Sequence, residues 1–272
     1  MASACHVRSI SLPSRPHQST LDVDIQLERL RSSQSTSSPS NLSGLKDLYE
    51  SIDDFLQLQA TQKAISDDNS MDKSLDRSLR LFDVCAATRD IFSQMKEILK
   101  ELQSSLRRKT GSESVEAYMA AKKLLSKEMC KCLRNLKCSQ RNCSSYQEKD
   151  SSIVVGTLRQ AEEACLEIFE SLLAIISCSN PKTKRWSLVS KLLQSKRISS
   201  CEGESNGINE VVKMERELMA SRSSKEMSCG ELKNLLKSLE GIELTIQEVE
   251  ELGCVYKLLV KTRVSILNIL SR

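Results

Sequence analysis

Four cysteines close together offer the most tempting metal chemistry in the sequence. They are Cys130, Cys132, Cys138 and Cys143, in the stretch CKCLRNLKCSQRNC. Four thiolates can bind zinc tetrahedrally, and zinc knuckles usually take two of them from a CxxC pair. No CxxC occurs here, and a CxC pair on a helix directs its two side chains about 200° apart. We therefore expect no metal, and interpret these residues as reduced, partly buried thiols.

The eleven cysteines of the chain do not indicate a disulfide framework either. They are scattered through helical patterns, and no apolar signal-peptide core precedes them. Cys85, Cys165 and Cys254 lie in apolar helical neighbourhoods, where a free cysteine behaves as a small buried hydrophobe. This usage favours a reducing compartment, and we expect a cytoplasmic protein.

Histidine is confined to the N-terminal stretch, which holds both histidines of the chain, His6 and His17. A Ser/His/Asp or Cys/His arrangement would have to recruit one of them. No GxGxxG, Walker-type loop or HExxH motif occurs, and eight glycines are too few to hide a phosphate cradle. We predict no catalytic residue, no cofactor and no enzymatic activity.

A basic amphipathic segment, PKTKRWSLVSKLLQSKR at 181–197, is a candidate binding face. It contains no acidic residue, and on a helix its apolar residues would share one side with Trp186, the only tryptophan of the chain. The cations are Lys182, Lys184, Arg185, Lys191, Lys196 and Arg197. Such a helix suits an anionic membrane surface or a calmodulin-like groove. The plainer interpretation is that Trp186 packs on the rest of the protein while the lysines face water.

The N-terminal stretch HVRSISLPSRPH at 6–17 has three interpretations. Arg8, Ser11 and Pro13 fit the Arg-Ser-x-phosphoSer-x-Pro pattern that 14-3-3 proteins bind, with the phosphate on Ser11. The stretch also meets the composition of a chloroplast transit peptide, since it contains Ser and Arg and no acid precedes Asp22. The third interpretation is a disordered tail.

The overall charge and hydropathy argue against a nucleic-acid-binding protein and against a membrane-spanning protein. The formal charge of +4 is the small difference between 40 basic and 36 acidic residues, so we expect no nucleic-acid binding. No window reaches the roughly 18 consecutive apolar residues of a spanning helix. The chain could therefore bind an anionic membrane only peripherally, through the segment 181–197.

The elements that must position these residues are helices. Eight glycines, four prolines and 3% aromatics leave few turn signals, and apolar residues recur at three- and four-residue steps. The spacing predicts a short helix over 21–32 and longer ones over 42–65, 72–108, 113–137, 153–177, 208–222 and from 231 almost to the end, with a loop at 139–145. We expect an all-α, elongated antiparallel bundle at 44–272, with a flexible linker near 199–207. Residues 1–43, rich in Ser and Pro, read as a disordered segment.

Ordered sequence blocks carry a family resemblance. They are HVRSISLPSRPH, LSGLKDLYESIDDFLQL (42–58), SLRLFDVCAATRDIF (78–92), ELQSSLRR (101–108), WSLVSKLLQSKR (186–197) and LVKTRVSILNILS (259–271). Together they resemble the BYPASS-related plant family. The resemblance implies a helical fold without catalytic residues and a role in root and shoot development; some members carry plastid-targeting predictions. It also favours a retained docking motif at 6–17, because a cleaved peptide need keep only its composition.

These observations predict a non-enzymatic helical protein-interaction or regulatory protein. The alternative is a peripheral membrane adaptor that uses the segment 181–197. For location, the alternatives to the cytoplasm are the chloroplast and the surface of a membrane.

Overall fold

The protein is all-α, as predicted. The computed structural model describes residues 17–33, 40–68, 70–108, 111–145, 152–177, 206–221 and 228–272. Its elements are α1 (Gln18–Ser33), α2 (Ser40–Leu56), α3 (Gln59–Ser66), α4 (Met71–Arg107), α5 (Gly111–Ser145), α6 (Ile153–Ser177), α8 (Asn206–Ser221), α9 (Cys229–Glu248), the 3-10 turn η1 (Val249–Glu251) and α10 (Leu252–Leu270).

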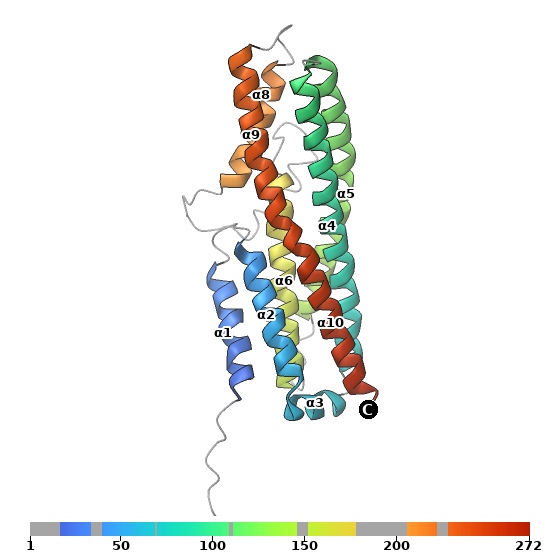
Figure 1. The fold of residues 1–272 in the computed structure, drawn as a ribbon. Coiled ribbons are helices and arrows are strands. Elements are labelled where there is room, and N and C mark those ends of the chain that lie inside the picture. Colours follow the sequence, from blue (N-terminus) through green and yellow to red (C-terminus); the bar gives the residue numbers. More distant parts are fainter. Residues whose placement is uncertain are drawn as a thin grey trace, which may run out of the picture.

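The helices form an elongated antiparallel bundle (Figure 1). Helices α4 and α5 make a long hairpin along its whole length. The run of α9, η1 and α10 crosses the bundle from the upper left to the lower right of the view, where α10 lies against α4. The upper half of the view also contains α8, whereas α1, α2 and α6 complete the lower half. Helix α3 lies across the lower end, beside the end of α10. Long helices joined by short connections pack as antiparallel neighbours, which explains this order.

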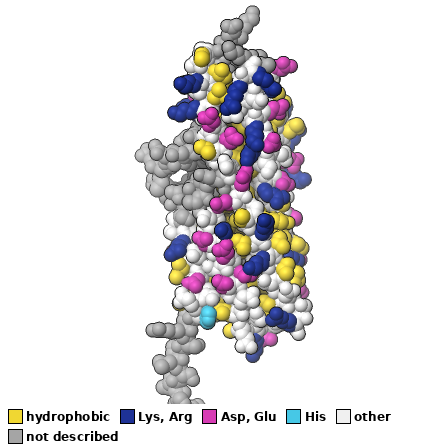
Figure 2. All heavy atoms as spheres, viewed as in Figure 1, with side chains coloured by type: hydrophobic (Ala, Val, Ile, Leu, Met, Phe, Trp, Pro, Cys, Tyr) yellow, Lys and Arg dark blue, Asp and Glu magenta, His cyan; other side chains and the backbone are white. Residues whose placement is uncertain are grey.

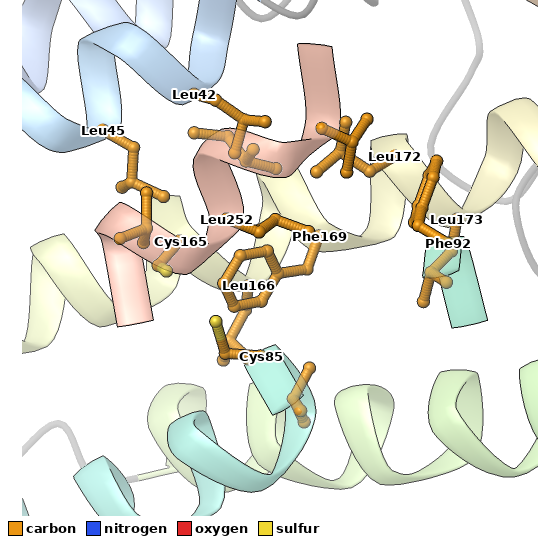
Figure 3. Packing of buried hydrophobic residues seen from close by; sticks show 14 of the residues in the cluster. Leu42, Leu45, Cys85, Phe92, Cys165, Leu166, Phe169, Leu172, Leu173 and Leu252 are labelled. Carbon is orange, nitrogen blue, oxygen red and sulfur yellow. The ribbon is translucent and has the colours of Figure 1, made fainter. Parts of the chain in front are cut away.

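One continuous apolar core joins the helices. Phe169 of α6 is fully buried, and Figure 3 shows it among Cys85 of α4, Leu166 of α6 and Leu252 of α10. The periodic apolar residues of each helix supply this core, because positions three and four apart lie on one side of a helix. Burial of such a side chain contributes roughly 1.5–3 kcal/mol, which offsets the small intrinsic stability of isolated helices.

The predicted helix over 42–65 is two helices. Backbone bonds from Gln57 N–H to the Asp54 carbonyl (3.2 Å) and from Leu58 N–H to the Phe55 carbonyl (3.3 Å) close α2 in a tight turn. Leu58 is extended at φ −67° and ψ 131°, so the chain changes direction before α3. The turn keeps Phe55, Leu56 and Ile65 buried, which a straight helix past the end of the bundle would not do.

The loop predicted at 139–145 was wrong, because α5 continues through it to Ser145. Leu136 and Ser139 are buried, and the Gln140 amide donates to a Glu170 carboxylate oxygen of α6 at 3.1 Å. Packing on α6 therefore outweighs the turn-forming tendency of the Ser, Asn and Cys residues there. The last predicted helix is likewise interrupted by the three-residue turn η1, in which Val249 stays buried.

Helix α1 extends the short helix predicted at 21–32 and packs on α2 and α6. Val23, Leu27 and Leu30 are buried, so this part of the segment expected to be flexible belongs to the core. Gly44 of α2 makes the close approach possible. A Cβ atom there would lie 2.8 Å from a methyl carbon of Leu30.

Candidate functional site

Both binding segments predicted from the sequence lie outside the described residues. This applies to Arg8, Ser11 and Pro13, and to the whole segment 181–197 with Trp186. The helix and the docking motif proposed there stay predictions. The candidate site lies where α4 and α10 pack together, and none of the sequence motifs predicts it.

The cysteine cluster is spread along α5. Cys132 is buried with its sulfur 3.8 Å from the Thr88 hydroxyl of α4, whereas Cys138 is exposed. Burial raises the pKa of the Cys132 thiol, so it stays protonated and unreactive. Within the described ranges, no three His, Cys, Asp or Glu residues are grouped so as to hold a metal ion.

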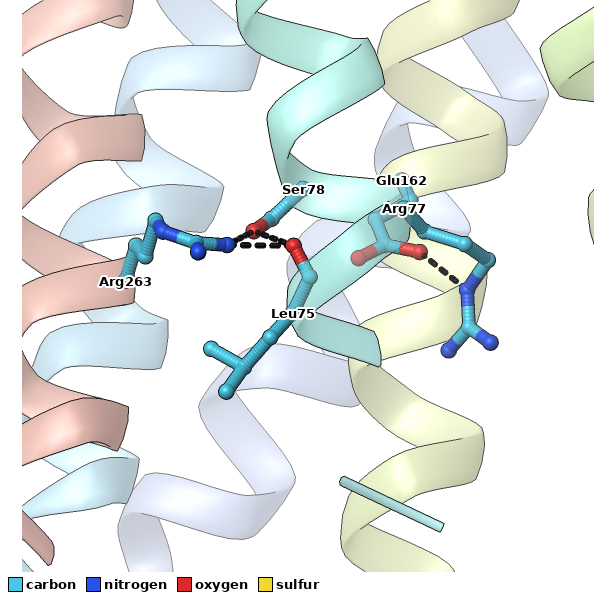
Figure 4. Close-up of polar contacts among 5 residues, drawn as sticks. All are labelled: Leu75, Arg77, Ser78, Glu162 and Arg263. Atoms are coloured by element: carbon cyan, nitrogen blue, oxygen red, sulfur yellow. Dashed lines mark hydrogen bonds and ion pairs between the residues drawn. The ribbon is translucent and has the colours of Figure 1, made fainter. Parts of the chain in front are cut away.

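A buried ion pair lies inside the lower half of the bundle. Arg77 Nε of α4 is 2.9 Å from Glu162 Oε2 of α6, and both side chains are about nine-tenths buried. Nearby, the Arg263 guanidinium of α10 donates to the Leu75 carbonyl and, at 2.6 Å, to the Ser78 hydroxyl (Figure 4). We call Arg77, Ser78, Glu162 and Arg263 the polar centre. It ties α4, α6 and α10 together.

The electrostatics of the polar centre are dominated by burial. Burial raises the pKa of Glu162 to about 7, although the Arg77 guanidinium acts in the opposite direction. Burial also raises the pKa of Cys85 to about 12 and that of Cys165 well above its usual value. These two thiols are therefore protonated at physiological pH, which suits packing and not nucleophilic attack. The burial expected for Cys254 was wrong, because its side chain is exposed on α10.

The enclosed space at the polar centre is too small for a substrate. A cavity of about 20 Å³ is lined by residues that include Tyr49, Glu162 and Thr262. Sites for small organic ligands typically measure about 300–1,000 Å³. An open hollow of about 510 Å³ lies between α3 and the end of α10, and the described residues that line it include no Asp, Glu or His side chain.

The surface above the polar centre carries an exposed apolar stripe. Val260, Val264 and Leu267 of α10 are 37%, 48% and 42% exposed, and Leu79 of α4 is 46% exposed. Tyr256 lies between the two helices. We call these five residues the α4–α10 face. Figure 2 shows hydrophobic side chains gathered over this part of the lower half, with lysines and arginines among them.

Contacts of Tyr256 with α4 and a buried stripe of α10 hold the α4–α10 face in place. The Tyr256 ring packs on Phe82 of α4 with 6.0 Å between ring centroids, and the Arg89 guanidinium carbon lies 5.5 Å from the Tyr256 ring centroid. On the opposite side of α10 a second stripe is buried, comprising Leu252, Val255, Leu259, Thr262, Ile266 and Ile269. Helix α10 is therefore anchored by its buried stripe, and the described residues leave its second apolar stripe partly exposed.

The sequence contained a signal for this face. Val260, Val264 and Leu267 repeat at four- and three-residue steps, one residue out of register with Leu259 and Ile266. A helix with one buried face needs only one such stripe. Helical spacing alone does not tell which of the two stripes is buried.

The described helices include none that is both long and apolar enough to cross a membrane.

One of the comparisons with known proteins identifies a family. No match to the chain was found among curated proteins or among solved structures. A sequence profile of the family described as Protein BPS1 matches residues 41–269, which run from the second residue of α2 to the last but one of α10 and include the polar centre. The chain therefore belongs to this BYPASS-related plant family, as its ordered sequence blocks indicated.

Proposed function

We propose that the chain is a non-enzymatic protein-interaction and regulatory protein of the BYPASS-related type, acting in root and shoot development. The observation that carries the interaction role is the α4–α10 face. It presents apolar side chains on a rigid helix pair, and the developmental role comes from the family to which the chain belongs. We place its action in the cytoplasm, in line with the protonated, buried thiols Cys85, Cys132 and Cys165.

The chemistry of the described residues supports a role without catalysis. The polar centre is largely buried, its cavity has room for about one water molecule, and its charges are engaged in contacts between helices. A dry polar pocket of substrate size with converging carboxylates and a lysine would favour an enzyme instead.

The test is affinity capture from plant tissue with a variant that breaks the face. Val264→Asp places a charge on the half-exposed stripe, and Leu124→Asp is the matched control, since Leu124 is 63% exposed on α5. Thermal unfolding should show that both variants fold like the wild type. We expect Val264→Asp to lose specific partners that Leu124→Asp retains. If both variants recover the same proteins, the α4–α10 face is not the interaction surface.

The N-terminal motif extends this proposal to a phosphate-dependent partner. Phosphate on Ser11, with Arg8 before it and Pro13 after it, fits a 14-3-3 groove. A synthetic peptide of residues 1–17 should bind a 14-3-3 protein only when Ser11 is phosphorylated. In plant tissue, unchanged binding and localisation of Ser11→Ala would return the stretch to a plain tail.

A peripheral membrane adaptor is the second candidate function, because the segment 181–197 joins six cations to an apolar side without any acid. Flotation with phosphatidylserine-containing liposomes tests it. Neutralising Lys182, Lys184, Arg185, Lys191, Lys196 and Arg197 together should abolish flotation. Flotation that survives the neutralisation, or that never occurs, removes this candidate.

A further inference from the structure

The α4–α10 face has a cationic edge on the side of α10 that faces α2. The Lys261 ammonium lies 2.9 Å from an Asp53 carboxylate oxygen of α2, which fixes the direction of this edge. Lys257 is four residues earlier, one turn away on the same side, and is exposed. Helix α10 contains no carboxylate, and within the described part of the chain Lys257 makes no ion pair. Lys257 is therefore the free cation of this edge.

The opposite edge of the face, on α4, carries the two carboxylates Asp76 and Asp83 and one exposed cation between them, Arg80, which leaves the edge with a net negative charge. Ser78 points to α10, since its hydroxyl accepts a hydrogen bond from Arg263, and Leu79 follows it on the outer side. Asp76 and Asp83 lie three residues before and four after Leu79, so they share its outer side, turned further from α10. Both are exposed, and neither makes an ion pair in the described residues.

The two edges face outward at the same height along the bundle. The Arg263–Ser78 and Tyr256–Phe82 contacts fix the alignment of the two antiparallel helices. Lys257 follows Tyr256 and Asp83 follows Phe82, so the free cation and a free carboxylate lie at one level. The exposed apolar stripe runs between them.

We propose that the α4–α10 face binds a second copy of the chain about a twofold axis parallel to the bundle. In this dimer α10 of each copy packs on α4 of the other, so Val260 and Val264 meet Leu79 of the partner subunit. Rotation about this axis exchanges the two edges and leaves their height unchanged. Lys257 then faces Asp83 of the partner subunit, and the pair occurs twice. The inference rests on the proposed function, that this face is an interaction surface.

The charges select this orientation over the other twofold arrangement. An axis lying across the helices would place α10 on α10 and α4 on α4. The cationic edges would then meet each other, as would the acidic edges, and like charges in contact oppose association. A parallel axis matches both the apolar stripe and the two charged edges.

Sedimentation velocity on the full chain, over a series of concentrations, tests the dimer. We expect Lys257→Glu alone and Asp83→Lys alone each to raise the dimer Kd about tenfold, because twofold symmetry changes every edge pair twice. The double variant should restore the wild-type Kd, since it exchanges the charges and keeps the pair. Lys127→Glu is the control for charge reversal, since Lys127 is exposed on α5, away from the face.

A wild-type chain that stays monomeric at every concentration overturns the proposal. So does a dimer that neither single reversal weakens, or one that the double variant does not restore. The affinity capture with Val264→Asp keeps the two ideas separate. If the chain is a monomer and Val264→Asp still loses a specific partner of another sequence, self-association is wrong and the proposed interaction surface stands.

Discussion

Replacement of Glu162 by glutamine should remove a large part of the pH dependence of stability. In the folded chain, burial raises the pKa of Glu162 from 4.5 to about 7. The neighbouring Arg77 guanidinium lowers this pKa, but by less than burial raises it. A raised carboxyl pKa stabilises the fold fully below the unfolded value of 4.5, and this contribution is lost as the pH rises through 7. The wild type should therefore be more stable at pH 5 than at pH 8.5 on account of this group.

The size of the effect follows from the two pKa values. The difference between 4.5 and about 7 corresponds to roughly 3 kcal/mol, and most of it falls between pH 5 and pH 8.5. A glutamine side chain at this position has no proton to lose, and its amide oxygen can still accept a hydrogen bond from Arg77 Nε. The wild type should therefore lose roughly 2–3 kcal/mol of unfolding free energy between pH 5 and pH 8.5 that Glu162→Gln does not lose.

Urea unfolding at several pH values, followed by circular dichroism, measures this difference. Glu128→Gln is the control, because Glu128 is exposed on α5 and its replacement should leave the pH profile parallel to that of the wild type. The other charged and titratable groups near Glu162 are Glu163, Tyr49 and Cys165, and all are present in both proteins. Parallel profiles for Glu162→Gln and the wild type would refute the reasoning from burial.

Three further substitutions probe the packing and the caps. Asp68 accepts hydrogen bonds from Ser70 and from Ser152 N–H (3.3 Å); burial raises its pKa, but these bonds outweigh burial and lower it to about 2. Asp68→Asn should therefore cost about 1 kcal/mol at pH 7, after allowance for solvent screening, and the cost should fade as the pH drops towards 2 in acid titrations. Ser228→Ala removes the N-cap of α9 and should lower the unfolding free energy, measured by urea unfolding, by about 1 kcal/mol. Ser228→Asp should leave the unfolding free energy unchanged, because aspartate can also cap the helix. Phe169→Ala empties a fully buried site and should cost about 3–5 kcal/mol by the same measurement, with Phe169→Leu costing less.

The helices of this protein were largely predictable because their signals are local. Helix α4 occupies Met71–Arg107, against a prediction of 72–108, and α6 occupies the predicted 153–177. In both, apolar residues recur at three- and four-residue steps over many turns, and that spacing alone defines a buried side. The break after α2 and the continuation of α5 were not predictable in this way. Each depends on which helix lies opposite, and that partner is remote in the sequence.

The polar centre was hidden for the same reason. Arg77 and Glu162 are 85 residues apart, and nothing in the sequence around either marks it as buried or paired. Many acidic and basic residues of the chain lie in similar helical contexts and face water. Only the packing of α4 on α6 selects these two.

The all-α class, the positions of the long helices and the family could all be predicted from the sequence, because helical periodicity and ordered blocks are properties of neighbouring residues. The tertiary structure alone decided which apolar stripe of α10 is core and which is surface. Val260 and Val264 are as apolar as Leu259 and Ile266, and both stripes follow helical spacing. Arg263 bonds α10 to α4 and Lys261 bonds it to α2, and with α10 held in that orientation only one stripe can turn inward.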